Sequence, residues 1–164
     1  MYCRKIELDE IVNVCHIYLE EENIVPNRSD LQKYIEHSKK IYERMMQFGS
    51  YTYGCFTDTV DKTKSKLIGV INVNKNLDFY PGYHLSPYVH LETFIVAKAY
   101  RNSGVGTFLM KDVMNQIKKE GYSYVIIQSG NLAVKKIAEN TGLKESLFDM
   151  RNDQITSYHI NLDD

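Results

Sequence analysis

The sequence predicts an α/β protein in which helices flank a twisted, mixed and mostly antiparallel sheet. Two stretches near the N-terminus place apolar residues at helical spacing, and several later stretches are rich in β-branched and aromatic residues. From residue 90 onward, strand-like and helix-like segments alternate, which is typical of β-α-β units. The complete predicted order is β-α-α-β-β-β-α-β-α-β-β.

The N-terminal half is expected to supply the first strand, two helices and a hairpin. Residues 2–7 fit a short strand, and apolar residues recur at helical spacing over 11–19. A second helix is expected over 29–49, from a capping box at Ser29 to Gly49. Residues 51–57 and 67–73 are separated by a polar run, so they are expected to form an antiparallel hairpin.

The C-terminal half is expected to contain the core of the sheet, after a long loop over residues 74–89. Strands are expected at 91–96, 124–128, 143–149 and 154–162, and helices at 105–120 and 132–140. Glycines at positions 121 and 142 are expected to end these two helices.

Composition narrows the class of protein. The chain has 164 residues, of which 43% are hydrophobic and 25% charged, and this profile predicts one globular domain over 1–164. Its 20 Lys and Arg residues nearly balance 21 Asp and Glu residues, so neither nucleic acid nor a membrane is an expected partner. No signal peptide or long apolar run is recognisable, and a cytoplasmic location is therefore expected. Cys3, Cys15 and Cys55 lack metal-binding or disulfide spacing and are interpreted as reduced packing residues.

The most informative segment is a glycine-containing turn between the strand at 91–96 and the helix that follows. Gly104 and Gly106 allow a tight turn and a close approach to a ligand, while the first helical turn offers unpaired N–H groups. With Arg101 and Lys98 at its rim, the turn suits a diphosphate. The turn lacks the GK[ST] ending that a Walker loop requires. It also lacks the third glycine of a dinucleotide fingerprint, because Leu109 stands at that position. The alternative is a plain turn that uses glycine only for geometry.

The run Arg101-Asn102-Ser103-Gly104-Val105-Gly106 matches the signature of the GNAT superfamily of acyl-CoA N-acyltransferases. That signature is an arginine or glutamine, two residues, a glycine, one residue, and a glycine or alanine. The segment from Asn131 to Leu143 is similar to the next motif of the family, and the predicted element order agrees. The chain therefore resembles GNAT proteins over nearly its whole length, which implies acetyl-CoA as cosubstrate and no metal.

The resemblance implies where this cosubstrate would bind. Its pyrophosphate would lie on the glycine turn, its pantetheine arm would pair with the fourth strand, and its thioester would lie where strands four and five splay apart. The implied cofactor-binding residues are Phe94, Ile95, Val96, Arg101, Asn102, Ser103, Gly104, Val105, Gly106, Thr107, Asn131 and Lys136. For Lys136, simple surface solvation is the alternative.

Glu92 is the predicted catalytic base. An alkyl amine has a pKa of roughly 10, so its attack on the thioester needs a positioned base or a water relay. The resemblance implies that a glutamate near this position works through water. An exposed or salt-bridged strand glutamate is the alternative interpretation, and His84 and His90 are weaker candidates for the base.

One position departs from the family pattern. The family commonly has a tyrosine that protonates the departing thiolate, where this chain has Ala138. Protonation could fall to Tyr124, Ser129, Tyr158 or water, since a thiol pKa of about 8.5 makes a dedicated acid dispensable. The other interpretation is a catalytically weak acyl-CoA-binding sensor.

The acceptor is expected to be the primary amine of a small molecule. Tyr83, His84, Tyr88 and Tyr158 are the expected acceptor contacts, because aromatic faces suit an organic cation. Tyrosine-rich loops also simply pack over sheets, which is the alternative for each of them. Acetylation of a protein or peptide remains a competing function, and a monomer or homodimer is expected.

Overall fold

A computed structural model of the chain describes residues 1–59, 64–75, 88–145 and 156–163. Its elements follow the predicted order, so the predicted α/β class is confirmed. The elements are β1 (Tyr2–Lys5), the 3-10 turn η1 (Leu8–Glu10), α1 (Ile11–Glu21), α2 (Arg28–Gln47), β2 (Tyr51–Phe56), β3 (Leu67–Asn74), β4 (Tyr88–Val96), the 3-10 turn η3 (Lys98–Tyr100), α3 (Val105–Lys119), β5 (Tyr124–Ser129), α4 (Leu132–Asn140), β6 (Lys144–Glu145) and β7 (Thr156–Asn161).

Some boundaries differ from the prediction. Asn27 rather than Ser29 caps α2, because its side-chain oxygen accepts a hydrogen bond of 3.0 Å from the backbone N–H of Asp30. The fourth strand begins at Tyr88 rather than at residue 91. Of the strand predicted at 143–149, residues 143–145 are described, and Lys144–Glu145 of these form a strand.

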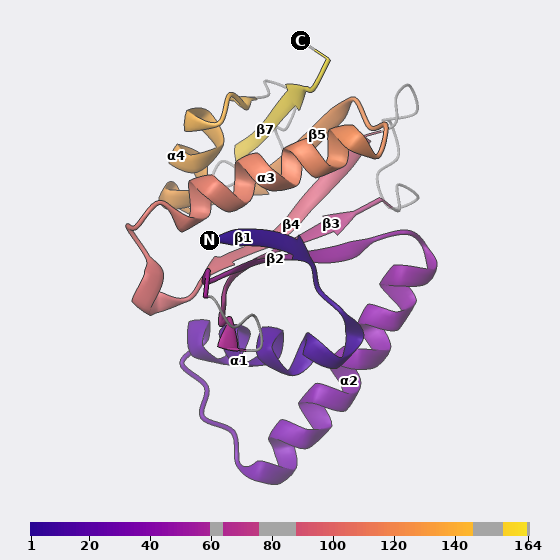
Figure 1. The fold of residues 1–164 in the computed structure, drawn as a ribbon, viewed down its shortest axis with the longest axis vertical. Coiled ribbons are helices and arrows are strands. Elements are labelled where there is room, and N and C mark those ends of the chain that lie inside the picture. The colour runs from indigo at the N-terminus through magenta and orange to yellow at the C-terminus, as the bar shows by residue number, and fades with distance from the viewer. Residues whose placement is uncertain (60–63, 76–87, 146–155, 164) are drawn as a thin grey trace.

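The described strands form one seven-stranded sheet in the order β1-β2-β3-β4-β5-β7-β6 (Figure 1). β4 and β5 pair in parallel, whereas the other neighbouring strands pair antiparallel. A parallel pair requires a crossover between its strands, and α3 supplies it. The mixed, mostly antiparallel sheet is the predicted one.

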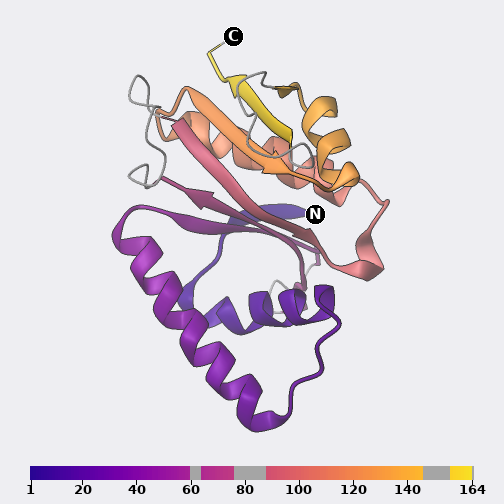
Figure 2. The same cartoon turned by 180° about the vertical axis from the view of Figure 1, so that it is seen from behind.

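Helices cover both faces of the sheet (Figures 1 and 2). α1 and α2 pack on one face, where Ile11, Val14 and Tyr42 belong to one apolar cluster. α3 and α4 pack on the other face over a larger cluster, to which Leu109 and Ala138 belong. These two faces are called below the α1/α2 face and the α3/α4 face.

The sequence of α3 accounts for its packing on the sheet and for the place where it ends. Val105, Leu109, Val113 and Ile117 are buried at a spacing of four residues, so one stripe of the helix faces the sheet. The chain leaves the helix through Gly121, whose φ of 85° is in the left-handed region that glycine adopts without strain. This continuous apolar contact fixes α3 on the sheet, and with it the position of the first turn of the helix.

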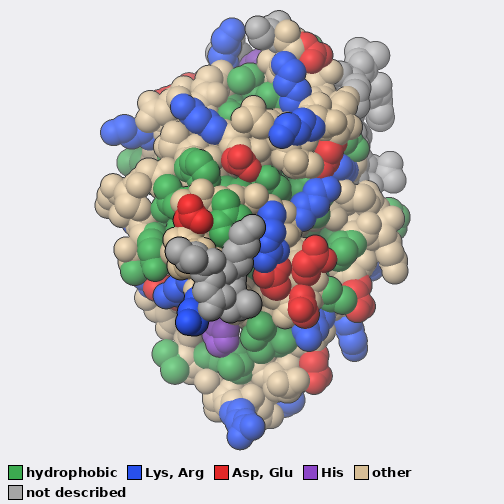
Figure 3. All heavy atoms as spheres, in the orientation of Figure 1, with side chains coloured by type: hydrophobic (Ala, Val, Ile, Leu, Met, Phe, Trp, Pro, Cys, Tyr) green, Lys and Arg blue, Asp and Glu red, His purple; other side chains and the backbone are tan. Residues whose placement is uncertain are grey.

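The surface carries mixed charge. On the face shown in Figure 3, basic and acidic side chains are interspersed, in keeping with the near balance of 20 basic and 21 acidic residues. None of the helices in the described ranges combines the length and the apolar character needed to cross a membrane. The three cysteines are free thiols, and Cys3 lies directly opposite Cys55 in the β1–β2 pair.

Candidate active site

The two parallel strands of the sheet, β4 and β5, diverge about halfway along their length. β4 pairs with β5 only over the first four residues of each strand, from Tyr88 opposite Tyr124 to Leu91 opposite Ile127. Beyond this point β4 stays paired with β3 as far as Val96, and β5 stays paired with β7 as far as Ser129. Figure 2 shows the two strands diverging. The second half of β4 thus has an edge without a neighbouring strand in the described chain, at the place where the resemblance implies a splay.

The hydrogen-bond pattern shows which backbone groups face that open edge. The N–H of Ala97 donates to the Ile68 carbonyl at 2.9 Å, and Ile95 lies opposite Val70. Because residues of an antiparallel pair alternate between bonded and non-bonded positions, Ile95 also points its N–H at β3. The backbone groups of Phe94 and Val96 therefore point away from β3, toward the opening.

A β-bulge interrupts β4 just before this edge. Val70 lies opposite Ile95 and Asn72 opposite Glu92, so Thr93 and Phe94 together oppose a single residue of β3. Thr93 adopts φ of 46°, an unusual conformation for a β-branched side chain. Such strain is retained where the surrounding structure imposes it, and it is frequent at functional sites.

The bulge decides which face each side chain takes. Phe94 and Val96 pack against the cluster on the α3/α4 face. Glu92 lies opposite Asn72, whose side-chain amide donates to the Tyr18 hydroxyl of α1 at 3.3 Å. Cross-strand partners share a face, so Glu92 belongs to the α1/α2 face. Uninterrupted alternation would have put Glu92, Phe94 and Val96 on the same side.

The loop after η3 leads into a cradle of backbone donors at the start of α3. The first helical hydrogen bond runs from the Phe108 N–H to the Gly104 carbonyl at 3.0 Å, so the preceding N–H groups of the first turn have no partner within the helix. Gly104 has a φ of 84°, and a Cβ placed on it would meet nothing within 4 Å. Conformation requires this glycine, and the space above it is open to a ligand.

Gly106 lies close to the neighbouring helix α4. It is buried, and a Cβ at this position would come within 2.7 Å of Ile137 Cδ1 on α4. The close approach is therefore to the neighbouring helix and not only to a ligand. Since Ile137 Cδ1 is the end of a flexible, half-buried side chain, an alanine can be accommodated here if that side chain moves.

The charged residues at the rim are held by the end of α1. The Arg101 guanidinium pairs with the carboxylate of Glu21, and its Nε donates to the Val96 carbonyl at 3.0 Å. Lys98 Nζ donates to the Asn23 side chain at 2.5 Å. Of the remaining loop residues, Asn102 has a φ of 59° and Ser103 donates to the Tyr100 carbonyl at 2.6 Å.

The predicted residues on α4 take different positions. Asn131 caps the helix, because its side-chain oxygen accepts from the Ala133 N–H at 2.9 Å. Lys136 is exposed, and Ala138 is completely buried. Ala138, which the resemblance places where the family commonly has a tyrosine, is thus a small core residue.

Glu92 is half-buried and has two polar neighbours. Its Oε1 accepts from Asn74 Nδ2 at 3.2 Å and lies 3.0 Å from His90 Nδ1. The hydrogen bond from His90 lowers the pKa of Glu92 despite the opposing effect of burial, and Asn74 adds to the lowering. An ionised carboxylate only accepts hydrogen bonds, so His90 carries its proton on Nδ1. Glu92 is thus a paired glutamate beside the bulge.

Sequence reasoning missed Tyr18, Asn72 and Asn74, which join Glu92 and His90 in a polar group on the α1/α2 face. Burial raises the pKa of Tyr18, while its hydrogen bond with Thr93 opposes this rise. The only available signal was the presence of two asparagines in an otherwise apolar strand. Nothing in the sequence linked them to α1.

The expected acceptor contacts and alternative acids are scattered. Tyr83 and His84 lie outside the described residues, and for Tyr88 only the backbone is described. Tyr158 is buried in the cluster on the α3/α4 face, and its hydroxyl donates to Glu139 at 3.2 Å. Tyr124 starts β5 at the end remote from the splay.

A splayed strand pair that leads into a helix-terminal donor cradle defines a class of α/β protein suited to an extended, phosphate-bearing ligand. The model of the acetyltransferase (GNAT) family matches residues 12–143, and the chain belongs to this family. This match confirms the predicted resemblance and the predicted enzyme class, an acetyltransferase.

Solved structures share the whole fold. A putative acetyltransferase from Salmonella typhimurium, yncA, solved with its cofactor acetyl-CoA, is 12% identical with a TM-score of 0.68, covering 99% of this chain and 94% of its own. Spermidine N-acetyltransferase SpeG from Vibrio cholerae is 11% identical with a TM-score of 0.68, covering 99% and 95%. Ribosomal-protein-alanine N-acetyltransferase from Brucella melitensis is 14% identical with a TM-score of 0.67, covering 98% of each chain. Among curated proteins, no sequence matches significantly.

Proposed function

We propose that this chain transfers the acetyl group of acetyl-CoA directly to the primary amine of a small molecule. The observation that carries the proposal is the continuity between the open backbone edge at Phe94 and Val96 and the outward N–H groups at the start of α3. An extended ligand with phosphates at one end and amides along its arm is complementary to this surface.

The cofactor would use backbone groups more than side chains. Its pyrophosphate would accept hydrogen bonds from the N–H groups of Val105, Gly106 and Thr107, where the helix dipole favours negative charge. The pantetheine amides would pair with Phe94 and Val96 as an added strand does. Arg101 already lies at the Val96 carbonyl, so its guanidinium would turn from Glu21 to the phosphates.

Glu92 would accept the proton of the attacking amine through water. Its lowered pKa keeps it ionised at neutral pH, which makes it a constant acceptor but a weak base. A bridging water would carry this proton from the amine nitrogen to the carboxylate. A backbone N–H at the open edge would stabilise the developing oxyanion, a contribution of about 3 kcal/mol at comparable sites.

The departing thiolate would leave without a dedicated acid. Ala138 supplies no proton, and the thiol of coenzyme A, with a pKa of about 8.5, is a good leaving group near neutral pH. The same observation favours a second candidate function, a catalytically weak acyl-CoA-binding module. A measurement of catalytic turnover distinguishes the acetyltransferase from the binding module.

A small amine is the proposed acceptor because Glu92 is half-buried and α1 contributes Tyr18 to the polar group around it. SpeG acts on spermidine, and the Brucella melitensis protein on ribosomal-protein alanine, so the family fold accommodates both kinds of acceptor. Protein acetylation is therefore the competing outcome of the test.

The test is release of free thiol from acetyl-CoA in the presence of polyamines, amino sugars, amino acids or peptides. We expect release with one class of small amine, and a kcat about 100-fold lower for Glu92→Gln, as for loss of a general base. Glu43→Gln, an exposed change on α2, is the matched control. Tight acetyl-CoA binding without release for any acceptor would favour the binding module, and release with peptides only would favour a protein acceptor.

A further inference from the structure

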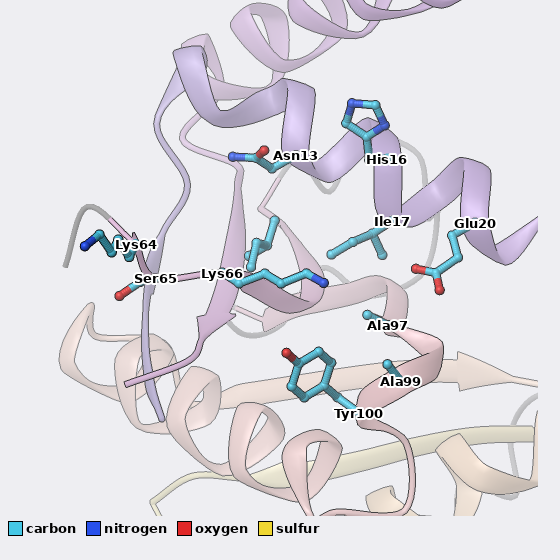
Figure 4. Close-up of a pocket in the computed structure, with 11 residues that line it drawn as sticks. Asn13, His16, Ile17, Glu20, Lys64, Ser65, Lys66, Ala97, Ala99 and Tyr100 are labelled. Atoms are coloured by element: carbon cyan, nitrogen blue, oxygen red, sulfur yellow. The ribbon is translucent and has the colours of Figure 1, made fainter. Parts of the chain in front are cut away.

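A pocket of about 430 Å³ lies between α1, the residues that lead into β3, and the η3 turn (Figure 4). Ile17 and Glu20 line it from α1, Lys66 from the segment before β3, and Ala97 and Tyr100 from the segment that follows β4. It does not include the open edge of β4 or the first turn of α3. The pocket is therefore distinct from the proposed acetyl-CoA site.

Glu20, Lys64 and Lys66 are the acidic and basic side chains that line this space, and Glu20 and Lys66 offer it opposite charges. Lys66 and Glu20 both line the pocket and approach it from different elements (Figure 4). Neither forms an ion pair with another residue in the described part of the chain, whereas Arg101 and Glu21 nearby are paired with each other. A ligand that carries both charges would compensate both side chains.

The wall between the charges is apolar. Ile17, Leu67 and Ala97 are buried residues that line the pocket, and Tyr100 adds an aromatic ring. Lys66 Nζ lies 5.7 Å from the centroid of that ring. An aromatic or branched aliphatic group would remove this wall from water.

We propose that this pocket binds a small zwitterion with an apolar side chain, such as an amino acid. Lys66 would bind its carboxylate, Glu20 its ammonium group, and the wall around Tyr100 its side chain. The volume falls within the range of about 300–1,000 Å³ that is usual for small-molecule sites.

The site adjoins the cofactor cradle without sharing its donors. Glu20 precedes Glu21, the partner of Arg101, and Tyr100 precedes Arg101 itself. The inference goes beyond the proposed reaction, because the zwitterion would bind in the absence of acetyl-CoA and of any acceptor.

Three matched probes test the charges on the ligand side. L-phenylalanine carries both charges, 3-phenylpropionate only the carboxylate and phenethylamine only the ammonium group. Each is titrated into the complete chain by ¹H–¹⁵N NMR without acetyl-CoA. We expect saturable shifts at Ile17, Ala97 and Tyr100, with affinity at least about threefold higher for L-phenylalanine than for either analogue, the effect of one exposed ion pair.

Two variants test the charges on the protein side. Lys66→Gln should reduce the affinity for L-phenylalanine to that of phenethylamine, and Glu20→Gln to that of 3-phenylpropionate. Lys33→Gln and Glu43→Gln on the exposed side of α2 should leave it unchanged, and circular dichroism checks the fold of each variant.

The proposal is wrong if L-phenylalanine shows no saturable binding, if the three probes bind equally, if the pocket variants bind like the wild type, or if the shifts centre on His90 and Glu92. All of these outcomes are independent of acetyltransfer.

Discussion

At the scale of single residues, the state of Glu92 depends on two neighbours. His90 and Asn74 both donate to its carboxylate, and His90 is the main cause of its lowered pKa. As pH falls through that lowered pKa, the carboxylate gains a proton and stops serving as an acceptor. His90 is thus a positioning residue that holds Glu92 ionised and oriented.

We predict that His90→Leu moves the acid limb of the kcat/KM profile to higher pH. The variant removes the donor, so the pKa of Glu92 returns toward its usual range and the carboxylate is lost earlier as pH falls. His90→Gln keeps an amide donor and should move the limb less, and His37→Gln on α2 is a control. An unchanged acid limb in His90→Leu, with the fold intact, would remove His90 from this role.

The two glycines of the turn should respond differently to alanine. Gly104→Ala places a side chain at φ of 84°, which costs about 1–2 kcal/mol of unfolding free energy. Gly106→Ala gains about 1 kcal/mol of helix propensity, which offsets the displacement of Ile137, so little net change is expected. Urea unfolding measures both. A larger loss in Gly106→Ala would mean that Ile137 cannot move, and Ile137→Val should then rescue it.

At the scale of elements, Glu120 links the end of α3 to β1 and to the segment after β3 through ion pairs. It follows α3 and accepts from Lys5 of β1 at 2.8 Å and from Lys75 after β3 at 2.5 Å. Burial opposes its ionisation, but hydrogen bonds from Lys5, Lys75 and Gln116 outweigh burial and lower the pKa of Glu120 to about 2. The hydroxyl of Tyr51 also donates to it, at 3.2 Å.

The sign of this shift predicts a pH dependence of stability. A lowered folded-state pKa contributes stability that is complete above the unfolded pKa near 4.5 and is lost as pH falls toward 2. At neutral pH, Glu120→Gln should lower the unfolding free energy by about 1–2 kcal/mol, and the deficit should shrink near pH 3. Urea unfolding at both pH values measures this, with Glu43→Gln as control. A deficit that stays constant with pH would show that packing, not charge, is what the substitution removes.

Sequence reasoning succeeded at the level of elements because helices and strands are local. The helical spacing of apolar residues and the glycine end were enough to place α3, and the motif around Gly104 identified the cradle. The face of Glu92 could not be obtained in this way. It depends on the bulge at Thr93, which exists only because β3 pairs on both sides of it.

At the scale of the whole molecule, the opening between β4 and β5 lies between the backbone groups proposed to bind the cofactor and the polar side chains proposed to act on the amine. The backbone edge of Phe94 and Val96 belongs with the cradle of α3, whereas Glu92 and His90 lie on the α1/α2 face. A thioester in the opening would be reached by an amine from the α1/α2 side. α1 contributes to both regions, through Tyr18 at Asn72 and through Glu21 at Arg101.

The Glu21–Arg101 pair should compete with cofactor binding. Both side chains are partly exposed, so their pairing adds little stability, but it engages the cation nearest the cradle. Glu21→Gln should lower the KM for acetyl-CoA by about two- to fivefold. Arg101→Gln should raise it by about tenfold, the effect of one charge-assisted hydrogen bond. Steady-state kinetics measures both, and Glu22→Gln is a neighbouring control. A higher KM in Glu21→Gln would mean that Glu21 holds Arg101 in position for the phosphates.

The sequence by itself determined the α/β class, the element order, the glycine turn and the resemblance that the family match confirmed. These features depend on local conformational preference and on residues adjacent in the chain. Only the tertiary structure decided that Glu92 meets Asn74, that Arg101 meets Glu21, and that Lys66 and Glu20 share a pocket. Such contacts join distant segments through strand register, a bulge and helix packing, and a single residue of register changes which face a side chain takes.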